Sequence, residues 1–344
     1  MESKRIIWID VLNVIACAGV LLLHCTNKEV HGFSGDITVN WLIGLVTHSM
    51  VLWPVNVFFM LSGFTLIKPV IFESGGVKRF YKRRLNRLLV PVLTWNTIYM
   101  LIQLILQWHK GGITDSPLTI INKYMSFQYN GFMWFFIPLI CLYLTMPFLS
   151  LFVLNAKRNI LKWYLLMSVV LNAVGCVGTS QGSHFFDIYL FGTRFLLFAV
   201  AGYYLGNYDL SYSTRRRLYA SGWICALMIF ISTIWLQLNI PERYNFFLKY
   251  TNLPCTMSAL SVFVYCKYTD WTKVFCKLHI RENHLAILSS ASLGIYLFQA
   301  IGFFIVLKFK MIADNLVLQF FIMYLLCLMF VITIKRLPII SKIV

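Results

Sequence analysis

Three polar residues of the first apolar run have types and a spacing that suit chemistry at a membrane. Asp10, Asn13 and His24 fall within about 40° of one stripe, because successive residues of an α-helix turn by about 100°. With a rise of about 1.5 Å per residue, Asp10 and His24 are about 21 Å apart and lie at opposite ends of the run. The pattern predicts a helix with one polar face and a histidine at its far end.

His24 is the first candidate for proton transfer. A neutral imidazole near a membrane surface is suited to take a proton from a hydroxyl group, because the unperturbed pKa of imidazole lies close to working pH. An interfacial histidine that is only hydrogen-bonded to another helix fits the same position. The spacing does not decide between these two interpretations.

Arg84 and Arg87 form a second candidate pair at the start of another apolar run. Residues three apart share one face of a helix, so both guanidinium groups point the same way. Paired guanidinium forks at a membrane surface suit a phosphorylated ligand. Basic clusters also set membrane topology, and the spacing is compatible with both roles.

Arg194 and Ser62 are two further polar residues within the apolar runs. Arg194 falls in the middle of the run 185–206, seven positions after Asp187, and a charge there needs a partner or a polar cavity. An internal pair with Asp187 and a contact with substrate both satisfy that need. The pair Ser62-Gly63 permits a close helix approach or a break in the helix, and alone it is a packing signal.

The composition identifies the elements that must position these residues. Of 344 residues, 59% are hydrophobic and only 12% are charged, and the mean hydropathy is +0.74, which excludes a soluble fold. A membrane-spanning helix takes about 20 apolar residues. The chain is therefore predicted to be an all-α polytopic membrane protein with about ten transmembrane helices, at 7–25, 41–67, 88–108, 132–153, 160–179, 185–206, 218–238, 252–267, 284–307 and 315–334.

The distribution of positive charge gives the orientation. If the N-terminus is inside, 22 of the 30 Lys and Arg residues lie in cytoplasmic segments and seven lie on the other side. Both termini are therefore expected in the cytoplasm. This topology and the attraction to anionic membrane lipid explain the net charge of +18, so no nucleic-acid partner is expected. The loops 25–40 and 109–131 are then external, where a surface acceptor could be contacted.

The cysteines and the chain ends suggest neither a metal site nor a second domain. Nine cysteines without CxxC spacing, mostly inside apolar runs, indicate no disulfide framework and no metal site. The first run carries Asp10 and has no A-x-A-like cleavage site, so it is interpreted as a retained helix. We expect one membrane domain, 1–344, with no appended soluble domain.

Five motifs in register resemble one known family, the integral-membrane acyltransferase-3 family. Their order and spacing cover nearly the whole chain, and the resemblance is greatest to compact bacterial O-acetyltransferases that modify surface polysaccharides such as the enterobacterial common antigen. The motifs are Trp8-Ile9-Asp10-Val11-Leu12 with Leu23-His24, Phe58-Phe59-Met60-Leu61-Ser62-Gly63-Phe64, Arg84-x-x-Arg87-Leu88-Leu89-x-Pro91, Trp134-Phe135-Phe136, and Ser292-Leu293-Gly294-Ile295-Tyr296-Leu297.

The resemblance implies an activity, a location and roles for the candidate residues. It implies a multi-pass protein of the bacterial inner (plasma) membrane that moves an acyl group, usually acetyl, from cytoplasmic acyl-coenzyme A to a hydroxyl of an extracytoplasmic glycan or lipid-linked saccharide. His24 matches the essential histidine of the family, whether transfer is direct or passes through an acyl-histidine. Arg84 and Arg87 match its paired arginines, which hold the coenzyme A phosphates. The channel and supporting residues are then Asp10, Asn13, Ser62, Arg194, Tyr296 and Gln299.

Two departures from the family pattern keep a rival hypothesis open. Asn13 stands where the family usually has an arginine, and Gln299 stands where many members have a histidine. A non-catalytic relative that exports a glycan or lipid, or that assists a polysaccharide synthase, fits these departures. Ion-coupled transport is less favoured, because the runs carry few acids for a proton relay. The oligomeric state is left open, a homo-oligomer included.

Overall fold

The computed structural model describes residues 5–33, 35–180, 194–279, 281–338 and 340–344. It is 83% helical, and the described residues form no strand. Within these described ranges, eight helical segments are long and apolar enough to cross a membrane. The prediction of an all-α polytopic membrane protein is therefore confirmed. These segments are Ile7–His31, Val39–Leu66, Gly76–His109, Gly131–Asn155, Arg158–Val177, Tyr212–Asn239, Glu282–Val306 and Leu316–Lys335.

The eight segments coincide with eight of the ten predicted runs. The other two runs contain shorter helices: α9 (Phe195–Asn207) has 13 residues, and α11 (Leu253–Tyr268) has 16. Both are shorter than the roughly 20 residues that a perpendicular span needs. Much of the predicted run 185–206, including Asp187, lies outside the described residues.

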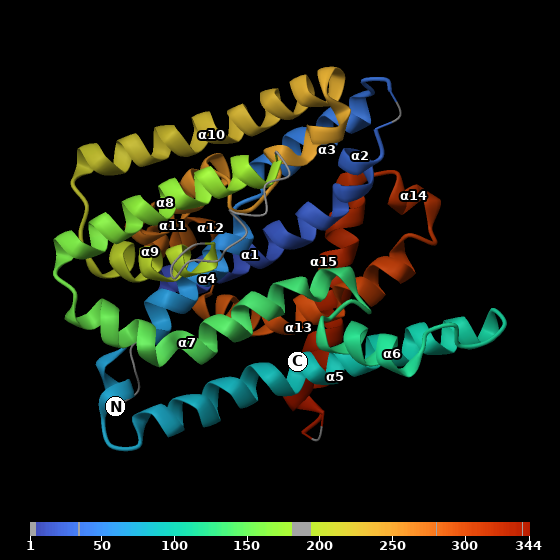
Figure 1. Ribbon diagram of the computed structural model, residues 1–344, viewed down its shortest axis with the longest axis horizontal. Helices are drawn as coiled ribbons and strands as arrows, with labels where there is room; N and C mark the ends of the chain where they lie inside the picture. Colours follow the sequence, from blue (N-terminus) through green and yellow to red (C-terminus); the bar gives the residue numbers. More distant parts are fainter. Residues whose placement is uncertain (1–4, 34, 181–193, 280, 339) are drawn as a thin grey trace. The chain divides into compact units, whose positions relative to one another are not determined.

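The chain forms two compact units, each made of two separate stretches of sequence. Unit 1 comprises Met1–Lys68 and Leu151–Ser290, and unit 2 comprises Pro69–Ser150 and Ala291–Val344. Unit 1 holds α1 (Ile7–Cys25), α2 (Asn27–His31), α3 (Val39–Met50), α4 (Pro54–Leu66), α8 (Arg158–Ser180), α9, α10 (Tyr212–Asn239), η4 (Pro241–Phe246), α11, α12 (Trp271–Leu278) and the first turns of α13 (Glu282–Val306) (Figure 1). Unit 2 holds η1 (Pro69–Phe72), α5 (Gly76–His109), α6 (Pro117–Met125), η2 (Gly131–Phe135), most of α7 (Phe136–Asn155), the rest of α13, α14 (Lys310–Ala313), α15 (Leu316–Lys335) and η5 (Ser341–Ile343).

The centre of unit 1 is a close contact between α4 and α9. A Cβ atom placed on Gly63 would lie 1.9 Å from the carbonyl oxygen of Ala199, and one on Gly202 would lie 1.9 Å from that of Met60. The two backbones therefore touch at glycines, as small residues allow in membrane helices. Next to this contact, the rings of Phe59 and Phe195 stack with their centroids 4.4 Å apart. The packing role predicted for Ser62-Gly63 is confirmed.

A break divides the predicted run 41–67 into α3 and α4. Pro54 is the first residue of α4, where its missing N–H costs nothing, and without that N–H it cannot donate to a carbonyl of α3 and extend that helix. The indole Nε1 of Trp53 donates to the carbonyl of Met50 at 2.9 Å, which satisfies a backbone group at the end of α3. The break thus lies at 51–53, before Ser62-Gly63, and it leaves His48 in the last turn of α3.

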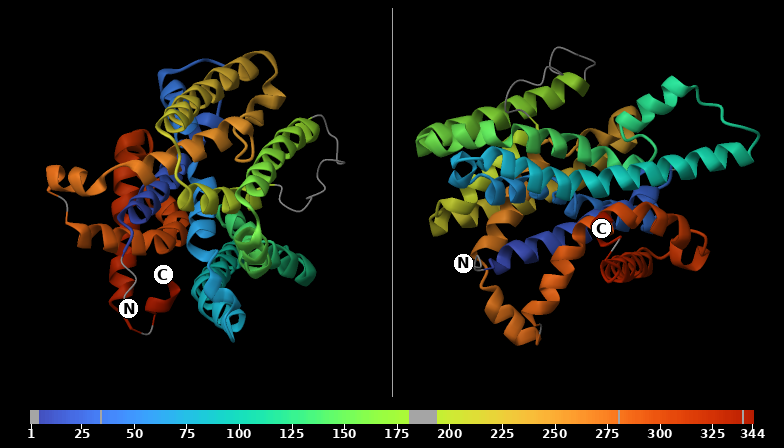
Figure 2. Two further views of the ribbon diagram at one scale, coloured as in Figure 1. Left: turned by 90° about the vertical axis from the view of Figure 1, so that its left-hand side faces the viewer. Right: turned by 90° about the horizontal axis from the view of Figure 1, so that it is seen from below.

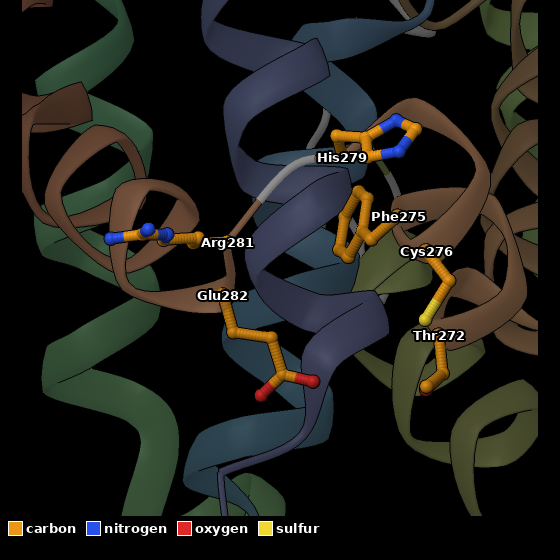
Figure 3. Close-up of a pocket in the computed structure, with 6 residues that line it drawn as sticks. All are labelled: Thr272, Phe275, Cys276, His279, Arg281 and Glu282. Carbon is orange, nitrogen blue, oxygen red and sulfur yellow. The ribbon is translucent and has the colours of Figure 1, made fainter.

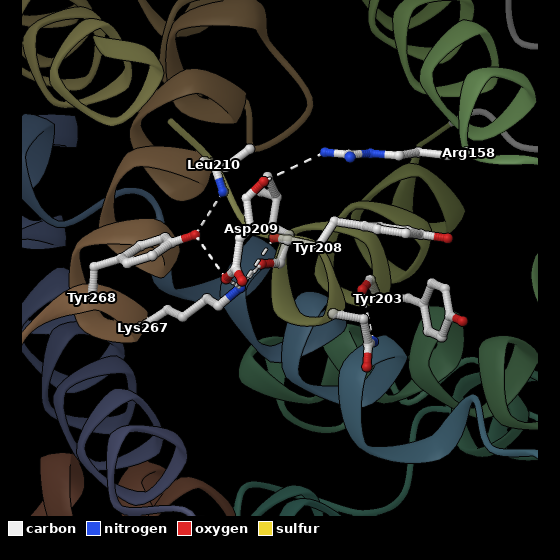
Figure 4. Close-up of polar contacts among 9 residues, drawn as sticks. Arg158, Tyr203, Tyr208, Asp209, Leu210, Lys267 and Tyr268 are labelled. Carbon is white, nitrogen blue, oxygen red and sulfur yellow. Dashed lines mark hydrogen bonds and ion pairs between the residues drawn. The ribbon is translucent and has the colours of Figure 1, made fainter. Parts of the chain in front are cut away.

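Side chains from α11 fix the short loop 208–211 between α9 and α10. Lys267 donates to the carbonyls of Leu205 at 2.9 Å and Tyr208 at 3.1 Å. The hydroxyl of Tyr268 accepts from the backbone N–H of Leu210 at 2.7 Å and lies 3.3 Å from the carboxylate of Asp209 (Figure 4). Some of the cations predicted to be cytoplasmic therefore also hold the fold together.

In unit 2, α5 and α7 run side by side (Figures 1 and 2), and the hydroxyl of Tyr81 donates to the carbonyl of Leu144 at 2.7 Å. A second contact joins α13 to α15, where the rings of Phe298 and Phe330 stack at 3.8 Å. The indole of Trp95 donates to the carbonyl of Ile343 at 2.8 Å, which ties η5 to α5. Both stretches of sequence are therefore needed to build this unit.

The outward faces of the long helices are apolar. Trp223 on α10 is 71% exposed, Phe148 on α7 is 70% exposed and Met329 on α15 is 68% exposed. Large apolar side chains in contact with solvent are unfavourable in water but not in hydrocarbon. This distribution agrees with a protein whose helices face lipid.

Substitution of Gly63 by alanine should destabilise unit 1. The added methyl group would meet backbone atoms of α9, which cannot move aside as a flexible side chain would, and overpacking of this kind costs about 1–3 kcal/mol or more. We expect a lower apparent unfolding temperature for purified protein in lipid nanodiscs. Gly131→Ala is the matched control, because a Cβ there meets nothing within 4 Å. Equal unfolding temperatures for both variants would contradict the proposed backbone contact.

Candidate functional site

Helix α1 carries three of the predicted site residues. It is continuous over 19 residues, as predicted, so Asp10, Asn13 and His24 have the helical spacing expected. Asp10 forms an ion pair with Arg5, and the amide of Asn13 donates to the carbonyl of Ser289 at 2.8 Å and lies 3.1 Å from its hydroxyl. Asp10 is therefore compensated, and Asn13 holds α1 to the first turns of α13.

His24 lies in the last turn of α1, next to a group of polar residues in unit 1. Its ring Nδ1 is 3.3 Å from the amide Nδ2 of Asn27. The hydroxyl of Thr26 donates to the carbonyl of Leu23 at 2.7 Å and lies 2.9 Å from Nδ1 of His48. Thr26 is fully buried and His48 is 4% exposed. The turn that carries His24 is therefore fastened to α3.

A third histidine extends this group. The ring of His31 lies 6.1 Å from that of His48, and its Nδ1 is 2.8 Å from the hydroxyl of Tyr244. Sequence reasoning missed the other members of this polar group. His48 could have been found, because it is an ionisable residue inside an apolar run, but Asn27 and Tyr244 have no such signal.

Ser62 and Arg194 occupy other parts of unit 1. The hydroxyl of Ser62 donates to the carbonyl of Phe58 at 2.9 Å within its own helix. Arg194 is not inside a helix as predicted, because α9 begins at Phe195 and Arg194 is its N-terminal cap, with φ of 58°. Its backbone N–H donates to Asn172 at 2.6 Å, and its carbonyl accepts from the same amide at 3.4 Å. The pairing with Asp187 concerns a residue outside the described ranges.

Arg84 and Arg87 lie in the first turns of α5, in unit 2. Arg84 is half-buried and Arg87 is exposed. Tyr143 lies within electrostatic range of Arg84, and Lys335 within range of Arg87. Among the residues that the structure describes, neither guanidinium is in an ion pair with an acid. This end of unit 2 is therefore positive and suited to an anion.

Tyr296 and Gln299 lie three residues apart on the part of α13 that belongs to unit 2. The hydroxyl of Tyr296 donates to the carbonyl of Phe132 at 2.7 Å, and its ring packs against Phe135 and Phe136. Gln299 is 1% exposed, and its amide Nε2 has no hydrogen-bond partner within the described part of the chain. A buried donor without an acceptor costs about 1–3 kcal/mol, so Gln299 is a candidate for contact with a ligand.

The predicted external loop 109–131 is ordered. Helix α6 begins after Ser116, whose hydroxyl accepts from the backbone N–H of Thr119. Hydrogen bonds from Lys123 at 2.8 Å and Gln107 at 3.0 Å lower the pKa of the Asp115 carboxyl below its usual value. Asp115 is therefore ionised at neutral pH and has a structural partner, so it is not a candidate proton donor.

A hollow of about 450 Å³ lies between α12 and the start of α13 (Figure 3). Phe275 forms part of its wall and also packs against Val11 and Leu285. None of the predicted site residues lines it. The lining residues are Thr272, Phe275, Cys276, His279, Arg281 and Glu282.

These helices define a multi-pass membrane protein, and comparison with known families supplies its class. The model of the acyltransferase-3 family, described as an acyltransferase domain, matches residues 6–336. The chain therefore belongs to this family and is a membrane acyltransferase. No curated protein and no solved structure matches it.

Gln299→Leu separates a ligand contact from a packing role. Leucine removes an unsatisfied buried amide at similar volume, so we expect unchanged or increased thermal stability. If Gln299 binds a ligand, acyl transfer falls at least several-fold while stability holds, as activity and unfolding assays on the same preparation would reveal. Gln319→Leu, at another buried glutamine of unit 2, is the control. Full activity in Gln299→Leu would rule out a ligand contact.

Proposed function

We propose that this protein is an O-acyltransferase that moves an acyl group, most simply acetyl, from cytoplasmic acyl-coenzyme A to a hydroxyl of an extracytoplasmic glycan or lipid-linked saccharide. Membership of the acyltransferase-3 family supports the reaction class. The observation that carries the assignment of the base is the position of His24 in the last turn of α1, which the buried Thr26 hydroxyl joins to His48 of α3. The proposed location is the bacterial inner membrane.

In the proposed reaction, His24 acts as a general base and then as a general acid. Its Nε2 takes the proton of the acceptor hydroxyl while the hydroxyl oxygen attacks the thioester carbonyl carbon. A carbon–oxygen bond forms, the carbon–sulfur bond breaks, and the coenzyme A thiolate takes the proton from the His24 imidazolium. The products are the glycan ester and free coenzyme A. Proton transfer by a positioned side chain typically accelerates a reaction by about 10²–10⁴-fold.

The proposed donor site lies on α5. Arg84 and Arg87 share a helix face, and coenzyme A carries phosphate groups that paired guanidinium forks bind through charge-assisted hydrogen bonds. The absence of an acidic partner for either arginine among the described residues supports this role. Pantetheine and the acyl group have no such charge, so the arginines bind the nucleotide end.

His24→Ala should abolish acyl transfer while the acceptor glycan is still made. We expect alkali-labile ester on envelope glycans from a deletion strain to be restored by the wild type and not by the variant. The loss should be on the order of 10²-fold or more, as for other general bases. His109→Ala, at the end of α5, is the control for histidine removal.

The same experiment tests the rival function. If the deletion removes the surface glycan itself and leaves its ester content per sugar unchanged, the protein is an exporter or a partner of a synthase. If His24→Ala restores ester as well as the wild type does, the base has been assigned to the wrong residue.

Arg84→Gln and Arg87→Gln should weaken binding of the donor's phosphates. A hydrogen bond to a charged group contributes about 1.5–3 kcal/mol, so we expect the KM for acetyl-coenzyme A to rise about 10- to 100-fold. The rate with acetyl-pantetheine, which lacks the nucleotide, should not change. Arg83→Gln, the adjacent exposed arginine, is the matched control. An equal loss with both donors would mean that the arginines are structural.

A further inference from the structure

Asn27 is a polar neighbour of the proposed base. Its amide lies 3.3 Å from Nδ1 of His24, three residues earlier in the chain. It is half-buried and is the first residue of α2, directly after Thr26. The family motif quoted above ends at His24 and does not include it. The mechanism proposed above therefore gives Asn27 no role, although it lies against the base.

A neutral imidazole carries its proton on one ring nitrogen and has a basic lone pair on the other. The hydrogen-bond partner of Nδ1 determines which of the two nitrogens carries the proton. An acceptor opposite Nδ1 fixes the proton there and makes Nε2 the base. A donor opposite Nδ1 occupies that lone pair and leaves the proton on Nε2. The group facing Nδ1 therefore decides whether His24 presents a base or a donor at Nε2.

The Asn27 amide can supply either group. Its two terminal atoms exchange by a rotation of about 180°, which keeps the same contact and replaces the nitrogen donor with the oxygen acceptor. With Nδ2 toward the ring, as in the structure, Nδ1 of His24 accepts. With Oδ1 toward the ring, Nδ1 donates and Nε2 is basic. The turn must hold the amide and the ring together in both states.

Thr26 and His48 provide that rigidity. The Thr26 hydroxyl proton is used in the bond to the carbonyl of Leu23, so its oxygen accepts from Nδ1–H of His48. Both side chains are buried, and they join the end of α1 to α3. Because Thr26 stands between His24 and Asn27, the backbone that separates these two residues is fixed.

We propose that Asn27 is a positioning residue that sets the tautomer of His24, with its amide oxygen toward Nδ1 in the active state so that Nε2 is the base. The proposal rests on the proposed function, because it assumes that His24 is the base. It assigns no contact between Asn27 and substrate. Asn27 acts through His24.

Two substitutions of Asn27 test whether the reaction needs a hydrogen-bond acceptor opposite Nδ1 of His24. Asn27→Asp keeps an acceptor at this position and removes the donor, so we expect kcat to remain within about threefold of the wild type. Asn27→Ala removes both, and kcat should fall on the order of 10²-fold while the KM for acyl-coenzyme A is unchanged. The control is Asn239→Ala, which removes an amide that donates to the carbonyl of Trp235 at the end of α10.

The outcomes distinguish the role of Asn27 from the proposed role of His24 as the base. Loss of activity in His24→Ala with full activity in Asn27→Ala would overturn the role of Asn27 and leave the base intact. Activity in His24→Ala would overturn both. If Asn27→Asp is as inactive as Asn27→Ala, an acceptor opposite Nδ1 is not what the reaction needs.

A spectroscopic measurement covers the case in which Asn27→Ala does not fold. The ¹⁵N shifts of His24, assigned by comparison with His24→Gln, report which ring nitrogen carries the proton in wild-type protein in nanodiscs. With a non-hydrolysable acyl-coenzyme A analogue and a hydroxyl acceptor bound, we expect protonated Nδ1. Protonated Nε2 in that complex would refute the proposal.

Discussion

Hydrocarbon cannot hydrogen-bond, and this constraint governs where each polar group of the chain lies. A polar side chain or backbone group inside a membrane must find its partner within the protein, at a cost of several kcal/mol if it does not. Asn13 meets Ser289, and Asn56 donates to the carbonyl of Tyr250 at 2.7 Å. The amide of Asn172 bonds both backbone groups of Arg194. In each case the polar group joins two elements, so the same bonds that satisfy it also specify the packing.

Gln299 differs from these amides because, within the described part of the chain, its buried Nε2 has no hydrogen-bond partner. Asn56 and Asn96 leave only an amide oxygen without a partner, and their nitrogens donate to carbonyls of other elements. The arginines of α5 differ in the same way, since they carry charge without an acidic partner among the residues described. His24 differs in another way, because the amide of Asn27 beside it can present either a hydrogen-bond donor or an acceptor. These are the groups of the candidate site whose hydrogen-bond or ionic partners are not fixed by the fold.

The helices could be predicted from the sequence, whereas their polar contacts could not. Long apolar runs set the bounds of α1, which begins at Ile7 and ends at Cys25 as predicted for 7–25. Pro54 marks the break between α3 and α4, but the apolar run continues across it, so hydropathy alone did not predict the break. Arg194 was expected mid-helix because the hydropathy continues across it, although the helix begins one residue later. Thr26 and His48 meet only because α1 and α3 pack together, and no spacing along one helix reveals a contact between two.

The assembly of unit 2 from residues 69–150 and 291–344 has a consequence for biosynthesis. A ribosome delivers α5, α6 and most of α7 first, then the remainder of unit 1, and only afterwards α13 and α15. The bond from Trp95 to Ile343 closes only after residue 343 has been made. Helix α5, with its arginines, must therefore wait in the bilayer while some 140 residues are inserted, with lipid or the insertion machinery in the places that α13, α15 and η5 take later. The order of translation thus makes the proposed donor site one of the last parts of the molecule to mature.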